Sequence, residues 1–216
     1  MIRLWHVPQS RSFRVLWLLE EMGAAYQVIP CSFLDGSLRA AEHLARSPAG
    51  RVPAVEIDGQ ALFESGAIMQ VLVETRAPDL APGMGDAERA AWLQWLHFAE
   101  TIGAHLANLT QQHIVLREDW MRSPTVMRLE ARRLAICLQA VVAQAGDGWL
   151  LERFSAADVA VGYGFVIGQR FVDLAAIPGA QAYLGRIAAR PAFRRALDRD
   201  GPAQIYTRDF YSPPEG

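Results

Sequence analysis

The sequence contains no lysine, and all 21 of its basic residues are arginine. This absence excludes reactions that depend on a lysine amine, such as Schiff-base catalysis and the anchoring of pyridoxal phosphate. It also excludes a phosphate-binding loop of the kind that requires a lysine. Enzymes that work through either device are therefore not candidates.

Cysteine is also scarce, since Cys31 and Cys137 are the only two and lie far apart without a Cys-x-x-Cys pair. A disulfide framework and a zinc site are both disfavoured, which suits a reducing cytosol. The first residues lack the long apolar stretch of a signal peptide. The apolar run 159–167 contains two glycines and is too short to span a bilayer. We expect a cytoplasmic protein with no metal and no tightly bound cofactor.

No charge of one sign dominates the chain. The 21 basic and 23 acidic residues give a net charge of −2, without a block of either sign. Nucleic acids and anionic membranes are therefore not expected partners. Hydrophobic residues make up 51% of the 216 positions and charged residues 20%, which is typical of a folded chain with one large or two small domains.

The first quarter to third of the chain alternates between patterns typical of strands and of helices. Strands are predicted at 2–7 and 26–29 and on both sides of Asp58-Gly59, and helices at 15–22, 37–45 and 65–76. The order β-α-β-α-β-β-α, with a right-handed crossover at its start, is typical of a thioredoxin-like α/β domain.

The proline- and glycine-rich segment 77–85 marks a domain boundary, and every later pattern is helical. Phe154, Ser155 and Asp158 form a capping box with a hydrophobic staple, which we interpret as a folding element without a catalytic role. The sequence thus predicts an α/β thioredoxin-like N-terminal domain over 1–78 and an all-α C-terminal domain over 86–216.

The stretch 50–68 combines three local signals. Asp58-Gly59 predicts a tight hairpin turn, and Ser65 is placed to cap the helix that follows. Val52 precedes Pro53, and a cis bond there would expose the backbone N–H and C=O of Val52 to an extended peptide. The hydroxyl of Ser65 and the amides of the helix start can bind a carboxylate. Each motif alone is common, but together they indicate a receptor for a small peptide acid.

A Val-Pro entry, an Asp-Gly hairpin and a Glu-Ser pair in this order resemble the glutathione-binding half of the soluble, cytosolic glutathione S-transferases. The resemblance extends over nearly the whole chain and is closest to serine-type bacterial members. It implies that the backbone of Val52 pairs with the cysteinyl residue of glutathione and that Pro53 is the cis-proline shaping this loop. It further implies that Ser65 receives the γ-glutamyl carboxylate and that Glu64 faces the γ-glutamyl amine.

The resemblance also implies a serine at the start of the first helix that holds the glutathione thiolate. Counting back from Gly23 places Ser12 at this position, and Ser10 is the alternative; both serines can equally cap the helix. Arg51 stands where many members have lysine and can reach the glycyl carboxylate, although a solvated loop arginine is as good an explanation. Arg39 is the weaker candidate for the same carboxylate.

The resemblance implies a glutathione transferase that joins the thiolate to a small, electrophilic, apolar second substrate and acts as a homodimer in detoxification. Glutathione is then a co-substrate, and no other cofactor is implied. Two alternatives remain open. One is a transferase-like interaction module without catalysis. The other is a specialised glutathione-dependent isomerase, dehalogenase or peroxidase with the same first domain.

Overall fold

A four-stranded mixed sheet forms the centre of the first part of the chain. The computed structural model describes residues 1–213, so residues 214–216, the end of the expected second domain, lie outside the described part. The strands are β1 (Ile2–His6), β2 (Tyr26–Pro30), β3 (Ala54–Ile57) and β4 (Gln60–Phe63), in the order β2-β1-β3-β4. β1 pairs with β2 in parallel, whereas β3 pairs antiparallel with both β1 and β4.

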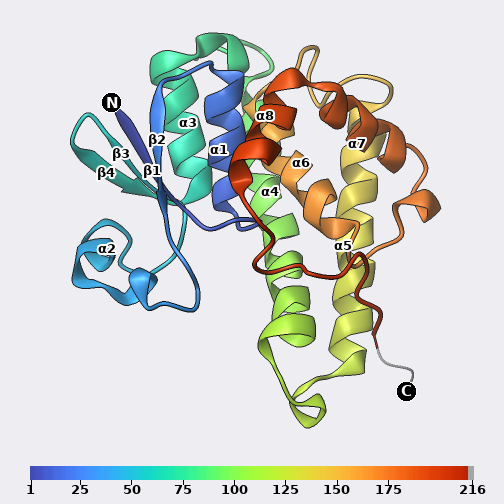
Figure 1. Cartoon of the computed structure of the whole chain (residues 1–216). Coiled ribbons are helices and arrows are strands. Elements are labelled where there is room, and N and C mark those ends of the chain that lie inside the picture. The colour runs from blue at the N-terminus through green and yellow to red at the C-terminus, as the bar shows by residue number, and fades with distance from the viewer. Residues whose placement is uncertain (214–216) are drawn as a thin grey trace. The chain divides into compact units, whose positions relative to one another are not determined.

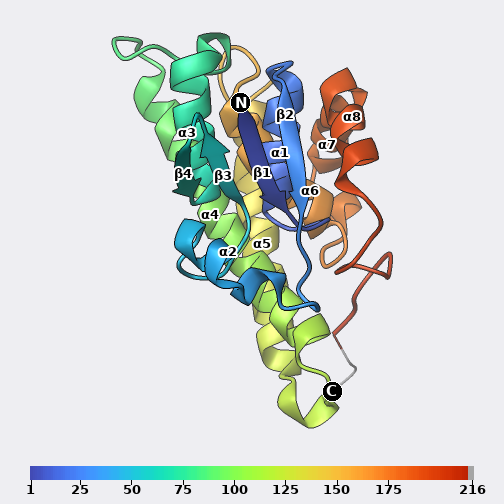
Figure 2. The ribbon, with the colours of Figure 1, turned by 60° about the vertical axis from the view of Figure 1, so that its left-hand side comes forward.

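Three helices accompany this sheet within residues 1–83. They are α1 (Ser12–Glu21), α2 (Ala41–Arg46) and α3 (Ser65–Arg76), and a single helical turn at Ser37–Arg39 precedes α2. Figure 2 shows α1 and α3 along one face of the sheet. The β-α-β-α-β-β-α order and the antiparallel hairpin confirm the expected thioredoxin-like fold.

Helix α8 (Pro191–Asp200) belongs to the same compact unit, which comprises Met1–Gly83 and Ala188–Ile205. Its Phe193 ring packs edge-on against Phe13 and Trp17 of α1, with ring centroids 5.9 and 4.9 Å apart. Arg190, just before the helix, forms two hydrogen bonds of 2.7 Å with the Glu21 carboxylate. An apolar contact and ion pairs thus join α8 to α1.

Glu20 of α1 makes the second ionic contact with α8. Its carboxylate accepts hydrogen bonds from Tyr26 and from Arg195, and Arg199 lies 3.2 Å away. Burial would raise the pKa of Glu20, but the hydrogen bonds from Tyr26 and Arg195 and the charges of Arg199 and Arg195 outweigh it. The pKa of this carboxyl is therefore below its ordinary value.

The second compact unit, which begins at Met84, is helical. It contains α4 (Arg89–Thr110), α5 (Pro124–Ala145), α6 (Ala156–Gly168) and all but the last two residues of α7 (Ala180–Ala189). Figure 1 shows α6 beside α4 and α5. α6 packs most closely on α4, because a Cβ at Gly164 would lie 2.6 Å from Ile102 Cγ2. The predicted capping box is confirmed: Asp158 accepts the Ser155 N–H, and the Ser155 hydroxyl accepts from the first turn.

The chain passes from the first unit to the second inside the proline-rich bridge, between Gly83 and Met84, and the segment Ala188–Ile205 belongs to the first unit again. The expected limits 1–78 and 86–216 remain a prediction of folding domains. They place α8 in the second domain, because a helical pattern does not reveal which unit its apolar face will cover. Among the described residues, no helix is both long and apolar enough to cross a membrane.

Candidate functional site

The loop before β3 presents the backbone of Val52. The Val52-Pro53 peptide bond is cis, as the sequence suggested, and β3 begins only at Ala54. Two contacts fasten the neighbouring Arg51: its N–H donates to Ser47 Oγ at 3.2 Å, and its carbonyl accepts from His43 Nε2 at 3.0 Å. Within residues 1–213, neither the N–H nor the C=O of Val52 has a hydrogen-bond partner. The contacts of Arg51 therefore hold the loop in place, while the N–H and C=O of Val52 stay available to hydrogen-bond a ligand.

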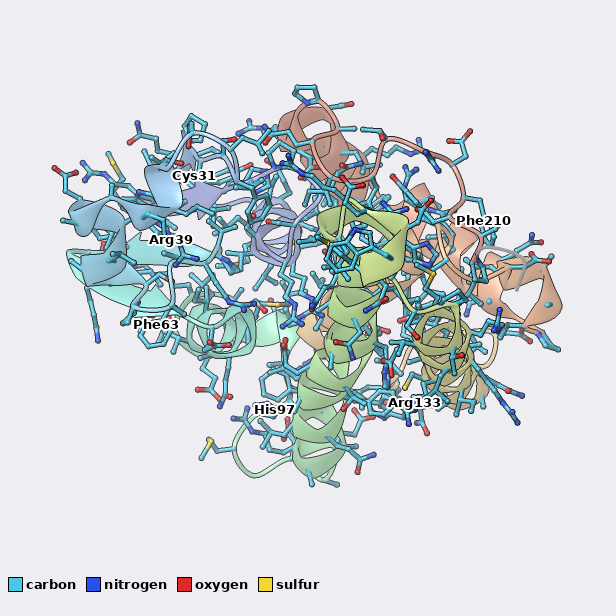
Figure 3. The ribbon with its side chains drawn as sticks, turned by 90° about the horizontal axis from the view of Figure 1, so that it is seen from below. Cys31, Arg39, Phe63, His97, Arg133 and Phe210 are labelled. Carbon is cyan, nitrogen blue, oxygen red and sulfur yellow. The ribbon has the colours of Figure 1, made fainter. Side chains whose placement is uncertain are left out.

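The side chain of Arg39 lies over the loop that carries Arg51. Both side chains are exposed. A Cβ at Gly50, next to Arg51, would lie 2.7 Å from Nη1 of Arg39, so the Arg39 side chain passes directly over the loop. Figure 3 labels Arg39 in the turn that precedes α2. The structure brings the two candidates for the glycyl carboxylate together and does not select between them.

Ser65 is the first residue of α3 and does not cap it, so the expected cap is wrong. Glu64 holds the N-cap position with φ of 70°, and no side chain there bonds to the helix amides. Instead the Ser65 hydroxyl accepts a hydrogen bond of 3.2 Å from Nη1 of Arg14. Glu64 is exposed beside it. Ser65 thus combines a hydroxyl, the positive end of a helix and an adjacent guanidinium, which together favour a carboxylate.

Arg14 was not anticipated from the sequence. It lies in the middle of α1 and is only 1% exposed, so a full positive charge is buried next to Ser65. The signal was present, because Arg14 interrupts the otherwise apolar series Phe13, Val15 and Leu16 on the buried part of the helix. Buried charges in proteins are paired or hydrogen-bonded, and Ser65 Oγ is one acceptor for this guanidinium.

The two candidate serines form one hydrogen-bonded pair at the start of α1. Their hydroxyl oxygens are 2.7 Å apart, and Ser10 Oγ also accepts the N–H of Ser12 at 3.2 Å. Ser12 is completely buried, whereas Ser10 keeps 7% of its surface exposed. The Ser12 hydroxyl already contacts the backbone of Val7 as well. Of the two hydroxyls, exposure therefore favours Ser10 as the one that a thiol can reach.

Behind the serines lie His6 and Asp200, which the sequence did not single out. His6 Nδ1 is 2.7 Å from Ser12 Oγ, and His6 Nε2 is 3.2 Å from the Asp200 carboxylate. Both residues are buried. His6 ends β1 and Asp200 ends α8, 194 positions later, so no local pattern relates them. The packing of α8 on α1 creates this contact.

Backbone strain is concentrated around these residues. Among the described non-glycine residues only Gln9, Asp58 and Glu64 have positive φ, at 63°, 51° and 70°. The Asp-Gly turn explains Asp58. The other two directly precede Ser10 and Ser65, and such strained conformations accumulate at functional sites. The N–H of Gln9 is held by the Asp200 carboxylate at 3.0 Å.

The chain is similar to proteins of one family. Residues 1–74 match the family model described as "Glutathione S-transferase, N-terminal domain". Glutathione S-transferase 4 of Zea mays is 30% identical over 193 residues, covering 83% of this chain and 83% of that protein. A maleylacetoacetate isomerase of Pseudomonas aeruginosa is 32% identical over 201 residues, covering 89% and 93%.

Other similarities are shorter or structural. Glutathione S-transferase 3 of Schizosaccharomyces pombe is 38% identical over 101 residues, and the alignment spans 46% of this chain and 41% of that protein. A crystal structure of a glutathione transferase from Pseudomonas putida, with one glutathione disulfide bound per subunit, superposes with a TM-score of 0.81 at 26% identity. That match covers 93% of this chain and 92% of the other.

Proposed function

The chain belongs to the glutathione S-transferase family, and on that basis we propose that it transfers the thiol of glutathione to a small, apolar electrophile. The observation that carries this proposal is a Val52 backbone without a hydrogen-bond partner in residues 1–213, in the same unit as the Arg14–Ser65 hydrogen bond and a serine pair at a helix start. These groups correspond to the three parts that glutathione offers: an extended peptide, a carboxylate and a thiol.

In the proposed complex, the cysteinyl residue of glutathione pairs with Val52 as a short added strand. The γ-glutamyl carboxylate lies at Ser65 and the start of α3, where the buried charge of Arg14 favours it. Glu64 faces the γ-glutamyl amine. Arg51 and Arg39 are the candidates for the glycyl carboxylate, and their shared position allows both to contribute.

The chemical requirement on the site is modest. A thiol has an ordinary pKa of about 8.5, and lowering it by about two units takes roughly 2.7 kcal/mol of preference for the thiolate. A hydrogen bond to a charged group contributes about 1.5–3 kcal/mol, and a helix N-terminus adds about 0.3–1 kcal/mol. One hydroxyl at the start of α1 is therefore enough. We assign this contact to Ser10, because Ser12 is completely buried.

A second candidate function is glutathione-dependent isomerisation of an unsaturated acid. The observation that favours it is the similarity to the maleylacetoacetate isomerase of Pseudomonas aeruginosa along 93% of that protein. Both reactions begin with attack of the thiolate on an electrophilic carbon, and they differ in whether glutathione leaves again. The same first unit serves both.

Calorimetric titration with glutathione, followed by thiolate absorbance of the bound peptide against pH, tests the proposal. We expect saturable binding and a lowered thiol pKa in the parent, and loss of that lowering in Ser10→Ala. If the lowering of the thiol pKa were lost only in Ser12→Ala, Ser12 and not Ser10 would be the residue that contacts the thiolate. Binding with an unchanged thiol pKa would favour a non-catalytic module.

The reaction type is tested separately with two substrates. An activated aryl halide reports conjugation through a stable thioether, and maleylacetoacetate reports isomerisation with glutathione recovered. Sedimentation at several concentrations tests the homodimer that we propose from family membership, and fractionation of cells tests the cytoplasmic location.

A further inference from the structure

A chain of buried polar groups connects the end of α8 to the serine that we assign to the thiol. We propose that His6 accepts the proton of the bound thiol through Ser12 and Ser10, and that Asp200 stabilises the imidazolium. These four residues are called the relay below. Only Ser10 touches the thiol, and the other three act through it. The inference rests on the proposed function and names the destination of the proton.

The direction of each hydrogen bond follows from the partners of His6. Nε2 faces the carbonyl oxygen and a carboxylate oxygen of Asp200, both at 3.2 Å. Both are acceptors, so Nε2 carries a proton in either charge state of the ring. In the neutral ring Nδ1 is then an acceptor, and the Ser12 hydroxyl donates to it across 2.7 Å. The other acceptor near that hydroxyl, the Val7 carbonyl, is farther away at 3.3 Å.

The remaining bonds are fixed by counting protons. Ser12 has a single hydroxyl proton, already given to His6, so Ser10 must be the donor in the 2.7 Å contact between the hydroxyls. Ser10 Oγ accepts the N–H of Ser12 with one lone pair. Its second lone pair is available to the S–H of glutathione. At rest, therefore, Ser10 can accept a proton but has none to donate to a thiolate.

Ionisation of the thiol reverses this direction. The S–H bond breaks with its electron pair left on sulfur, and the proton moves to Ser10 Oγ. Ser10 passes its own proton to Ser12 Oγ, and Ser12 passes its own to His6 Nδ1. The products are a thiolate that accepts a hydrogen bond from Ser10 and an imidazolium next to Asp200. After sulfur has bonded to the second substrate, a proton returns along the same hydroxyls to the leaving group or to solvent.

The charges around His6 suit a proton acceptor. Asp200 contributes a carboxylate from α8, and an adjacent negative charge stabilises an imidazolium. On the side of β2, His6 pairs with Pro30, and its carbonyl accepts the N–H of Cys31 at 2.8 Å. Burial raises the pKa of the Cys31 thiol, which therefore stays uncharged. From the start of α1, the Ser12 hydroxyl contacts Nδ1 of His6.

The competing explanation is that Asp200 and His6 only stabilise the fold here, because the Asp200 carboxylate also accepts the N–H of Gln9. Protonation of His6 distinguishes the two. We would record the imidazole nitrogen signals of protein labelled with ¹⁵N-histidine, with His6 identified among the five histidines by its loss in His6→Gln. The relay predicts an imidazolium at His6 when glutathione binds near neutral pH. It predicts a neutral ring with S-methylglutathione, which has no thiol proton.

Two variants break the relay while leaving Ser10 in place. Asp200→Asn keeps an acceptor for Gln9 and His6 but removes the charge, and Ser12→Ala interrupts the path. In both we expect His6 to remain neutral, and the thiolate fraction below the thiol pKa to fall about tenfold, since a neighbouring charge shifts a pKa by about one unit or more. Asp198→Asn, an exposed change on the same helix, should behave like the parent.

The outcomes separate the relay from the proposed function. Absence of glutathione binding, or binding without a thiolate, would refute both. A thiolate formed while His6 stays neutral would refute the relay alone, as would an imidazolium that forms equally with S-methylglutathione. If a variant does not fold, the two titrations of the parent protein still decide.

Discussion

Replacing Arg14 by Met should weaken glutathione binding specifically at the γ-glutamyl carboxylate. Met has a similar length and fits a position that is 1% exposed, so the main change is loss of a buried charge and of its 3.2 Å hydrogen bond to Ser65. A hydrogen bond involving a charged group contributes about 1.5–3 kcal/mol. This corresponds to a dissociation constant about 10 to 150 times higher.

Calorimetric titration with two ligands isolates this effect. Glutathione amidated at the α-carboxylate of its γ-glutamyl residue keeps the peptide and the thiol but lacks the charge. We expect Arg14→Met to weaken binding of glutathione and to leave that of the amide nearly unchanged. Arg128→Met, the same change at an exposed position of α5, is the control and should affect neither.

Arg14 and Ser65 are proposed to act together. The double variant Arg14→Met, Ser65→Ala should therefore bind glutathione about as tightly as whichever single variant loses more affinity. An equal loss for both ligands would refute the reasoning, since it would mean that Arg14 supports the fold of the site and not the carboxylate. Fully additive losses would show that the two residues bind independently.

Four further substitutions test contacts within the two units. Because the pKa of Glu20 is lowered in the folded protein, its ion pairs stabilise the fold fully above the unfolded pKa of about 4.3, and this stabilisation is lost as the pH falls through the folded pKa. In Glu20→Gln, the free energy of unfolding should therefore depend less on pH in this acid range. Asp158→Ala should cost at least about 4 kcal/mol in urea unfolding, because four buried donors lose their acceptor at about 1–3 kcal/mol each. Tyr183→Phe, which removes only one of these donors, should cost about 1 kcal/mol, and equal losses in the two variants would contradict the bond count. Gly50→Ala should destabilise the Val52 loop by about 1–2 kcal/mol, since Gly50 has φ of 61° and a Cβ there would lie 2.8 Å from a backbone oxygen. Thermal unfolding measures the loss of stability, and calorimetry measures the loss of glutathione affinity. An unchanged affinity would show that the loop does not bind the peptide.

The sequence predicted those features that short segments determine. The Asp58-Gly59 hairpin and the Ser155 capping box each depend on a few adjacent residues, and both are found in the structure. The cis bond at Val52-Pro53, which the family resemblance implied, is present as well. The order of strands and helices in the first unit was predictable for the same reason. Their residue types restrict the backbone directly, through positive φ, a proline ring or a side-chain acceptor.

The relay and the acid site depend on tertiary packing, and the sequence predicted neither fully. Counting residues identified Ser12, but its burial follows from the positions of His6 and Val7, which only the folded chain defines. Asp200 is 194 positions from His6. Ser65 was expected to cap α3, but α3 begins at Ser65 itself and Glu64, with its positive φ, holds the N-cap position.

The origin of α8 late in the chain determines when the first unit can be completed during synthesis. A ribosome that has made residues 1–83 has produced the whole sheet and the Val52 loop, but neither the ring that covers Phe13 and Trp17 nor the carboxylate behind His6. Both arrive only with α8, after the helices of the second unit have been made. The apolar surface of α1 therefore stays uncovered while those helices are synthesised, and a gene fragment ending at the bridge should yield an aggregation-prone product instead of a small glutathione-binding protein.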